Sequence, residues 1–164
     1  MVLGLHEYEQ SAKAEQARDF ESSEMYLKEA LKILKNSGQE KSLGYLFLLK
    51  RLGYVSFMGK KYSDSEKYFK VTANMMPMVT KNPANLFVAQ KNLLTLYTHI
   101  NLDKADEQAK RMTKDSEDLE FMPKHLRELS LMRANLHLLR SEYKMAKSLY
   151  RNVLQLHTSA DIGA

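Results

Sequence analysis

The chain has 164 residues, the length of one domain or one short repeat array. It has no Cys, which excludes a disulfide framework, a thiolate zinc site and a cysteine nucleophile, and its three Pro and six Gly are too few for a β-sandwich or barrel. The formal net charge is +5, but basic and acidic blocks alternate along the chain, whereas a nucleic-acid binder more often has one dense basic stripe. No apolar stretch approaches the ~20 residues that a membrane span needs.

Apolar residues recur at helical spacing along almost the whole chain, and no stretch shows sustained strand-type alternation. Prolines at 83 and 123 each fit the first position of a helix, the former after an Asn that can cap it. Asp103 can cap another helix. Together these signals predict eight helices. They span residues 5–17, 20–36, 40–58, 63–78, 84–99, 103–118, 124–140 and 142–157.

Three local signals set the other expected boundaries. Ser37 with Glu40, and Ser63 with Glu66, each have the spacing of a capping box, in which the hydroxyl and the carboxylate satisfy each other's backbone N–H groups. We therefore expect helices to begin near these two sites. Pro77 lacks an N–H group and is expected to stop the helix that precedes it.

The second helix of each predicted pair repeats one pattern. An aromatic residue or Leu is followed three positions later by a small residue, with further packing residues at offsets of seven and ten. The four sets are Phe20, Ser23, Leu27 and Ala30; Tyr62, Ser65, Phe69 and Thr72; Leu102, Ala105, Ala109 and Met112; and Tyr143, Ala146, Tyr150 and Val153. The small residues are 42, 40 and 41 positions apart, and the third repeat needs a turn one residue shorter. Such even spacing predicts a repeat array.

At these residues the chain resembles the tetratricopeptide repeat family. The second repeat carries the clearest match, with Leu49, Leu52 and Gly53 followed by the string GKKYSDSEKYFKVTANMMP. The usual family period is ~34 residues, and a period near 41 is similar to a longer-helix subset such as kinesin light chain. The resemblance implies an all-α fold, an α-solenoid of about four antiparallel helix pairs. The repeat domain would cover 1–157, with repeats of about 5–38, 39–81, 82–121 and 123–157, and 158–164 as a tail.

Motifs for catalysis or metal binding are not found in the sequence. The five His form no HExxH pattern and no pair at helical spacing, and the glycines are too scattered for a phosphate-binding loop. The carboxylate clusters at 103–107 and 115–120 are typical of solvated helix faces. We therefore expect no enzymatic activity, no cofactor and no metal.

The candidate partner-binding residues lie on the first helices, which line a concave groove in stacked arrays. They are Tyr8, Phe47, Lys50, Arg51, Tyr54, Phe57, Val88, Lys91, Asn92, Thr95, Leu131, Asn135 and Leu138. The large apolar side chains could anchor a ligand, Lys50 and Lys91 recur 41 positions apart, and Asn92 and Asn135 could hold a peptide backbone. The family's clamp for chaperone C-terminal carboxylates is not expected, because the first repeat offers Tyr8 and Ala12 in its place.

These features favour a non-catalytic protein-interaction scaffold or adaptor that binds a peptide or helix with apolar anchors and acidic residues. We expect an intracellular, cytoplasmic protein, with the mitochondrion as the alternative, no DNA ligand, and only indirect contact with a membrane. Three other functions stay open. One is assembly of an organellar membrane complex, because the chain is also similar to a mitochondrial family member linked to respiratory complex III; the others are a self-associating regulatory oligomer and an RNA binder using the basic segments.

The last predicted helix carries apolar residues that an ordinary polar capping helix would lack. They are Met145, Leu149, Val153 and Leu156. We expect a downstream repeat, a partner or a second copy to cover them, and the chain to be a fragment of a longer protein.

Overall fold

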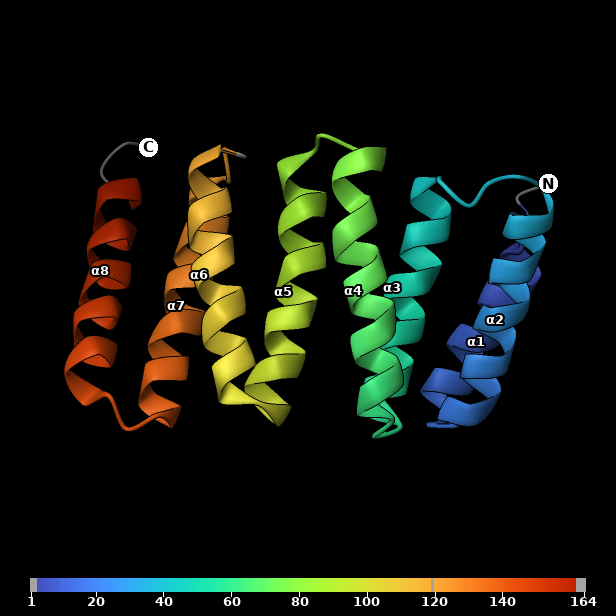
Figure 1. The fold of residues 1–164 in the computed structure, drawn as a ribbon, viewed down its shortest axis with the longest axis horizontal. Coiled ribbons are helices and arrows are strands. Elements are labelled where there is room, and N and C mark those ends of the chain that lie inside the picture. The colour runs from blue at the N-terminus through green and yellow to red at the C-terminus, as the bar shows by residue number, and fades with distance from the viewer. Residues whose placement is uncertain (1–2, 119, 162–164) are drawn as a thin grey trace. The chain divides into compact units, whose positions relative to one another are not determined.

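The computed structural model describes residues 3–118 and 120–161, with side chains to residue 155, and all regular secondary structure in this part is helical (Figure 1). The helices are α1 (Leu5–Gln16), α2 (Phe20–Asn36), α3 (Leu43–Met58), α4 (Tyr62–Val79), α5 (Pro83–Ile100), α6 (Leu102–Asp118), α7 (Pro123–Leu139) and α8 (Tyr143–Asp161). The sequence predicted each of them, and the predicted bounds differ from the observed ones by at most four residues.

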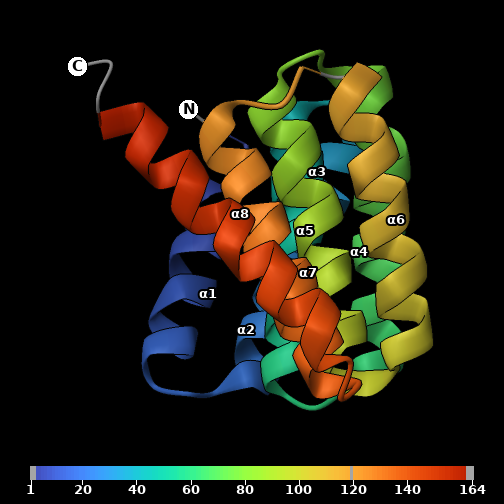
Figure 2. The ribbon, with the colours of Figure 1, turned by 90° about the vertical axis from the view of Figure 1, so that its left-hand side faces the viewer.

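The chain divides into two compact units, Met1–Leu96 and Tyr97–Ala164, and the division falls inside α5. In unit 1, α1 packs on α2, α2 on α3, and α3 on α4. In unit 2, α6 packs on α7 and α7 on α8, and both views show α8 alongside α7 (Figures 1 and 2). Each unit is therefore built by antiparallel helices that pack on their neighbours in chain order.

Small residues allow the paired helices to approach closely. Ser23, Ser65, Ala105 and Ala146, which the repeat pattern predicted as the small residues of the second helices, are all buried. On the first helix of the second pair, a Cβ added to Gly53 would lie 2.6 Å from the Phe69 ring. Only glycine fits there without displacement of the ring.

The turns inside the helix pairs share one backbone conformation. In the described chain, Arg18, Lys60 and Ser141 have φ values of 58°, 61° and 61°. The next N–H group in each turn reaches back to a helix carbonyl at 2.8 Å, for example from Lys61 to Ser56. This is the Schellman ending of a helix, which usually uses glycine at the left-handed position. The α5–α6 turn is shorter, as the repeat spacing predicted.

The two predicted capping boxes and the predicted stop at Pro77 were wrong. Ser37 ends α2, and Ser42 caps α3 by accepting from the Tyr45 N–H group at 3.1 Å. The predicted box at residues 63–66 lies inside α4, which begins at Tyr62. Pro77 also lies inside α4, because the Thr80 N–H group bonds to the Met76 carbonyl at 3.0 Å and closes a turn beyond the proline.

Two caps are made by asparagine. Asn82 accepts from the Ala84 N–H group at 2.9 Å, as the sequence predicted, and α5 begins at Pro83. The predicted cap of α6 was wrong, because Asn101 accepts from the Lys104 N–H group at 3.0 Å and Asp103 lies inside the helix. Asparagine is strongly favoured at this position, since its short side chain reaches the free N–H groups of the first turn.

Candidate functional site

The candidate site in unit 1 is built mainly by α3, which is apolar on almost every side. Its packing stripes bury Leu48, Leu52 and Val55. On the remaining side of α3, Phe47 is 42% exposed and Tyr54 is 43% exposed. These two large rings are therefore not sealed in the core, and they form the apolar part of the surface that the sequence assigned to a partner.

Aromatic contacts fix this surface. The ring of Tyr8 from α1 meets the ring of Phe47 edge-on, with centroids 5.6 Å apart and an interplanar angle of 61°. Phe57 is half-buried and its ring lies 5.8 Å from that of Tyr62. Edge-to-face pairs of this kind hold both rings in one orientation. Tyr8 and Phe47 thus present a fixed apolar surface, whereas Phe57 packs toward the α3–α4 turn.

Two small hollows lie on either side of Phe47, which lines both. The first, of about 280 Å³, is lined by Leu43, Leu46, Phe47, Lys50, Met76, Asn85, Val88 and Ala89. The second, of about 220 Å³, is lined by Leu3, Gly4, Leu5, Tyr8, Leu34, Gln39, Gly44, Phe47 and Leu48. Each is large enough for one apolar side chain of a ligand.

Lys50 is the cation at the rim of the first hollow. Its Nζ lies 4.8 Å from the centre of the Phe47 ring, a cation–π contact. Burial lowers the pKa of Lys50, and the positive charges of Arg51 and Lys91 lower it further. No carboxylate among the described side chains pairs with Lys50. A carboxylate from outside would therefore meet a partly desolvated cation.

Arg51 is already paired inside the fold. Its Nε donates to Glu15 of α1 at 3.0 Å, and its terminal nitrogen donates to the other carboxylate oxygen. The guanidinium carbon also lies 5.3 Å from the centre of the Tyr54 ring. Arg51 therefore ties α3 to α1, and sequence reasoning missed this pair.

The α5 residues extend the site in unit 1. Val88 lines the hollow beside Lys50. Lys91 lies with its Nζ 5.9 Å from the centre of the buried Phe87 ring. Asn92 is half-buried and Thr95 is exposed. Of these, the structure brings Val88 against Lys50, and Lys91 acts on Lys50 through its charge.

The unit 2 candidates lie on α7. Leu131 and Leu138 are exposed at helical spacing, and Asn135 lies between them. The Tyr150 hydroxyl of α8 donates to the Asn135 side-chain oxygen. This bond occupies one of the two groups that Asn135 was expected to offer to a peptide backbone, and leaves its NH₂ group.

Neither a metal site nor a membrane span is found in the described part of the chain. His, Asp and Glu side chains do not gather in groups of three or more that could hold a metal ion within residues 3–118 and 120–155. No helix in the described part is both long and apolar enough to cross a membrane.

The helix pairs, the buried small residues and the turn geometry define a tetratricopeptide-like repeat, an all-α solenoid fold. This fold is a scaffold typically used for protein interaction. No protein-family model matches the sequence, and no curated protein is significantly similar to it.

Two solved structures share the fold. The putative kinesin light chain with TPR-like repeats from Podospora anserina matches with a TM-score of 0.83 at 9% identity, over 96% of this chain and 76% of that one. BtubC (BKLC) from P. vanneervenii matches with a TM-score of 0.79 at 15% identity, over 92% of this chain. This chain spans 61% of the BtubC chain. The similarity to the long-helix kinesin-light-chain type agrees with the resemblance seen in the repeat period.

Proposed function

We propose that the chain is a non-catalytic interaction scaffold that binds a peptide or helix on the surface formed by Tyr8, Phe47, Lys50 and Val88 of unit 1. The observation that carries the proposal is Lys50, a half-buried cation with no described carboxylate partner, at the rim of an apolar hollow. The ligand would place one acidic side chain on Lys50 and apolar side chains in the hollows beside Phe47.

The expected energies suit a modest-affinity peptide site. A hydrogen bond between a carboxylate and a partly desolvated lysine contributes up to about 1.5–3 kcal/mol. Each apolar side chain that fills a hollow contributes about 1.5–3 kcal/mol when fully buried. Because Arg51 is held by Glu15, Lys50 is the principal cation for the ligand, and Lys91 strengthens the local positive potential.

A displayed peptide library selected on the full chain tests this function. We expect enriched peptides to carry Asp or Glu within a few residues of large apolar side chains. Lys50→Glu should weaken their binding at least tenfold, and Lys91→Glu should weaken it less. Lys67→Glu, the same change at an exposed position of α4, is the control and should leave binding unchanged. Enriched peptides that bind the Lys50→Glu variant as well as the parent chain would contradict the proposal.

A further inference from the structure

The second helices of three repeats each carry an ion pair at the same sequence position. Glu24 pairs with Lys28 at 2.5 Å in α2, and Glu66 pairs with Lys70 at 2.7 Å in α4. In α6 the equivalent acid is Asp106, which pairs with Lys110 at 2.6 Å. All three acids lie four positions after the first residue of their helix. The same position is therefore a carboxylate in the second helices of these three repeats.

The same register gives α8 the opposite charge. Lys147 occupies the position of the acids, and Arg151 occupies the position of their lysine partners. Lys144 adds a third cation, and no Asp or Glu occurs between residues 143 and 160. This side of α8 is therefore positively charged where the earlier second helices are neutralised.

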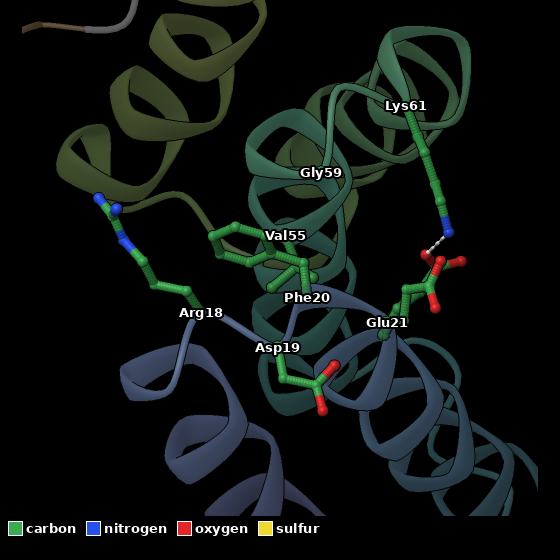
Figure 3. A pocket seen from close by; sticks show the side chains of 8 residues that line it. Arg18, Asp19, Phe20, Glu21, Val55, Gly59 and Lys61 are labelled. Carbon is green, nitrogen blue, oxygen red and sulfur yellow. Dashed lines mark hydrogen bonds and ion pairs between the residues drawn. The ribbon is translucent and has the colours of Figure 1, made fainter.

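The first repeat shows how this position is covered by the next helix. Glu24 accepts a second hydrogen bond, at 2.8 Å, from Lys61, which follows α3 and is labelled in Figure 3. Val55 of α3 and Phe20 of α2 line the same pocket. In unit 2, Arg140 after α7 likewise reaches Asp103 of α6 at 3.2 Å. In both places a cation of the following repeat meets an acid of the preceding one.

At the equivalent repeat positions, the apolar residues of α8 are exposed. Leu31 of α2 is 8% exposed, whereas its equivalent in α8, Leu154, is 67% exposed. Tyr143, the equivalent of Phe20, is 65% exposed. Tyr143, Lys147, Tyr150 and Leu154 recur at helical spacing and share one side of the helix. With Arg151 they are called the α8 face below. The side chain of Leu156 lies outside the described residues.

We propose that the α8 face binds an acidic amphipathic helix of a partner protein, laid against it as α3 lies against α2. The apolar residues of this surface have the arrangement that a helix covers in the first repeat. Lys61 and Arg140 each meet an acidic residue of the preceding helix, whereas the α8 face is basic. A helix that covers this face must therefore supply carboxylates to Lys147 and Arg151. This surface belongs to α8 alone, and the proposal does not depend on the Lys50 site.

A second copy of the chain suits this surface less well. In the repeat register, α1 would present His6 and Lys13 where α3 presents Leu48 and Val55. Lys13 would then lie beside Lys147, and two exposed polar side chains would replace two buried apolar ones. Phosphate ligands would use the cations but leave Leu154 uncovered. An acidic amphipathic helix satisfies both the charge and the apolar surface.

Binding of two matched synthetic helices to the full chain tests the proposal. The acidic peptide has Leu at alternating third and fourth positions, Glu beside this stripe, and Ala and Gln elsewhere. In the basic peptide every Glu is Lys. We expect the acidic peptide to bind at least tenfold more tightly than the basic one. Lys147→Glu with Arg151→Glu should reverse this preference, and Leu154→Gln should weaken both peptides.

Controls separate this surface from the rest of the chain. Lys114→Glu with Lys124→Glu makes the same charge change at exposed positions of unit 2 and should preserve the preference. Each comparison is repeated in the Lys50→Glu background, which removes the proposed unit 1 site, so that the preference that remains is that of the α8 face. All the substituted positions of α8 are exposed, so the variants should keep the parental circular dichroism spectrum.

Three results would overturn the proposal. The first is failure of the acidic peptide to bind more tightly than the basic one, or a preference for the acidic peptide that the Lys147 and Arg151 substitutions leave unchanged. The second is binding of an RNA duplex or phosphatidylserine vesicles that these substitutions abolish, without binding of the acidic peptide. The third is a dimer in sedimentation equilibrium that Leu154→Gln dissociates, which would make a second copy the occupant.

Discussion

The hydroxyl of Ser65 in α4 donates to the carbonyl oxygen of Gly53 in α3 at 2.8 Å, in a contact that is buried on both sides. The bond joins two small residues that are buried between the helices. It also explains the identity of both positions, because a larger side chain on either helix would separate the donor from the acceptor. The second repeat therefore depends on this contact for its geometry.

Gly53→Ala should destabilise the chain, because the new methyl group would lie 2.6 Å from the Phe69 ring. Overpacking of this kind costs about 1–3 kcal/mol. The matched control is Gly44→Ala at the start of the same helix, where the nearest atom is 3.7 Å away. There alanine should stabilise by up to about 1 kcal/mol through its helix propensity. Urea unfolding midpoints measure both changes, and equal shifts would contradict the packing argument.

Glu24 should make the chain sensitive to acid. Burial raises the pKa of its carboxyl group, but hydrogen bonds from Lys28 and Lys61 outweigh burial and lower the pKa below 4.5. A carboxyl group with a lowered pKa in the fold contributes stability that is present above pH 4.5 and is lost as the pH falls through its folded pKa. The unfolding free energy of the parent chain should therefore decrease below about pH 5.

Glu24→Gln should make that decrease shallower and cost about 2 kcal/mol at pH 7, because two charged hydrogen bonds are lost. Glu29→Gln, on an exposed part of the same helix, is the comparison and should have little effect at either pH. Unfolding free energies measured from pH 7 to pH 3 distinguish the two variants. Parallel pH profiles for the parent chain and Glu24→Gln would assign the acid sensitivity to other groups.

The helices and the small packing residues could be predicted from the sequence because both follow from spacing within one helix. Ser65 was identified from the repeat pattern and Gly53 from the family resemblance, and both are buried. The boundary signals were less informative. Ser37 and Ser42 are five residues apart and both can cap a helix, and only the path of the chain decides that Ser42 caps α3.

The electrostatic part of the candidate site could not be predicted in the same way. The Arg51–Glu15 pair joins residues 36 positions apart on different repeats, so its formation depends on how the helices stack. The recurrence of an acid at one repeat position, in Glu24, Glu66 and Asp106, is visible in the sequence once the repeats are aligned. What the alignment alone does not indicate is that Lys61 from the next repeat shares the first of these acids.

The left-handed residue Lys60 offers a route to greater stability. Its φ of 61° costs a residue with a side chain roughly 1–2 kcal/mol, whereas glycine adopts this conformation freely. Lys60→Gly should therefore stabilise the chain by up to about 1 kcal/mol, after allowance for the greater entropy of glycine in the unfolded chain. Lys67→Gly inside α4 should have the opposite sign, a loss of about 1 kcal/mol. Thermal unfolding measures both changes. Destabilisation by Lys60→Gly would contradict the argument that the left-handed conformation of Lys60 is strained.

Lys50 should slightly lower the stability of the free chain, because its role is to bind a ligand. Its pKa is lowered, chiefly by burial and also by Arg51 and Lys91, so the charged form is less favourable in the fold than in the unfolded chain. A base with a lowered folded pKa destabilises most when it is protonated, and this loss disappears as the pH rises above its folded and unfolded pKa values. Lys50→Met should stabilise the free chain at pH 7, by less than about 1 kcal/mol because the ammonium group is partly solvated.

The same substitution should weaken the selected acidic peptides at least tenfold, so stability and binding would change in opposite directions. Urea midpoints at pH 7 and pH 11, together with peptide titrations at pH 7, provide the measurement. The stability difference between Lys50→Met and the parent chain should become smaller at the higher pH. A Lys50→Met variant that is less stable than the parent, or one that binds the acidic peptides unchanged, would show that Lys50 serves the fold rather than a ligand.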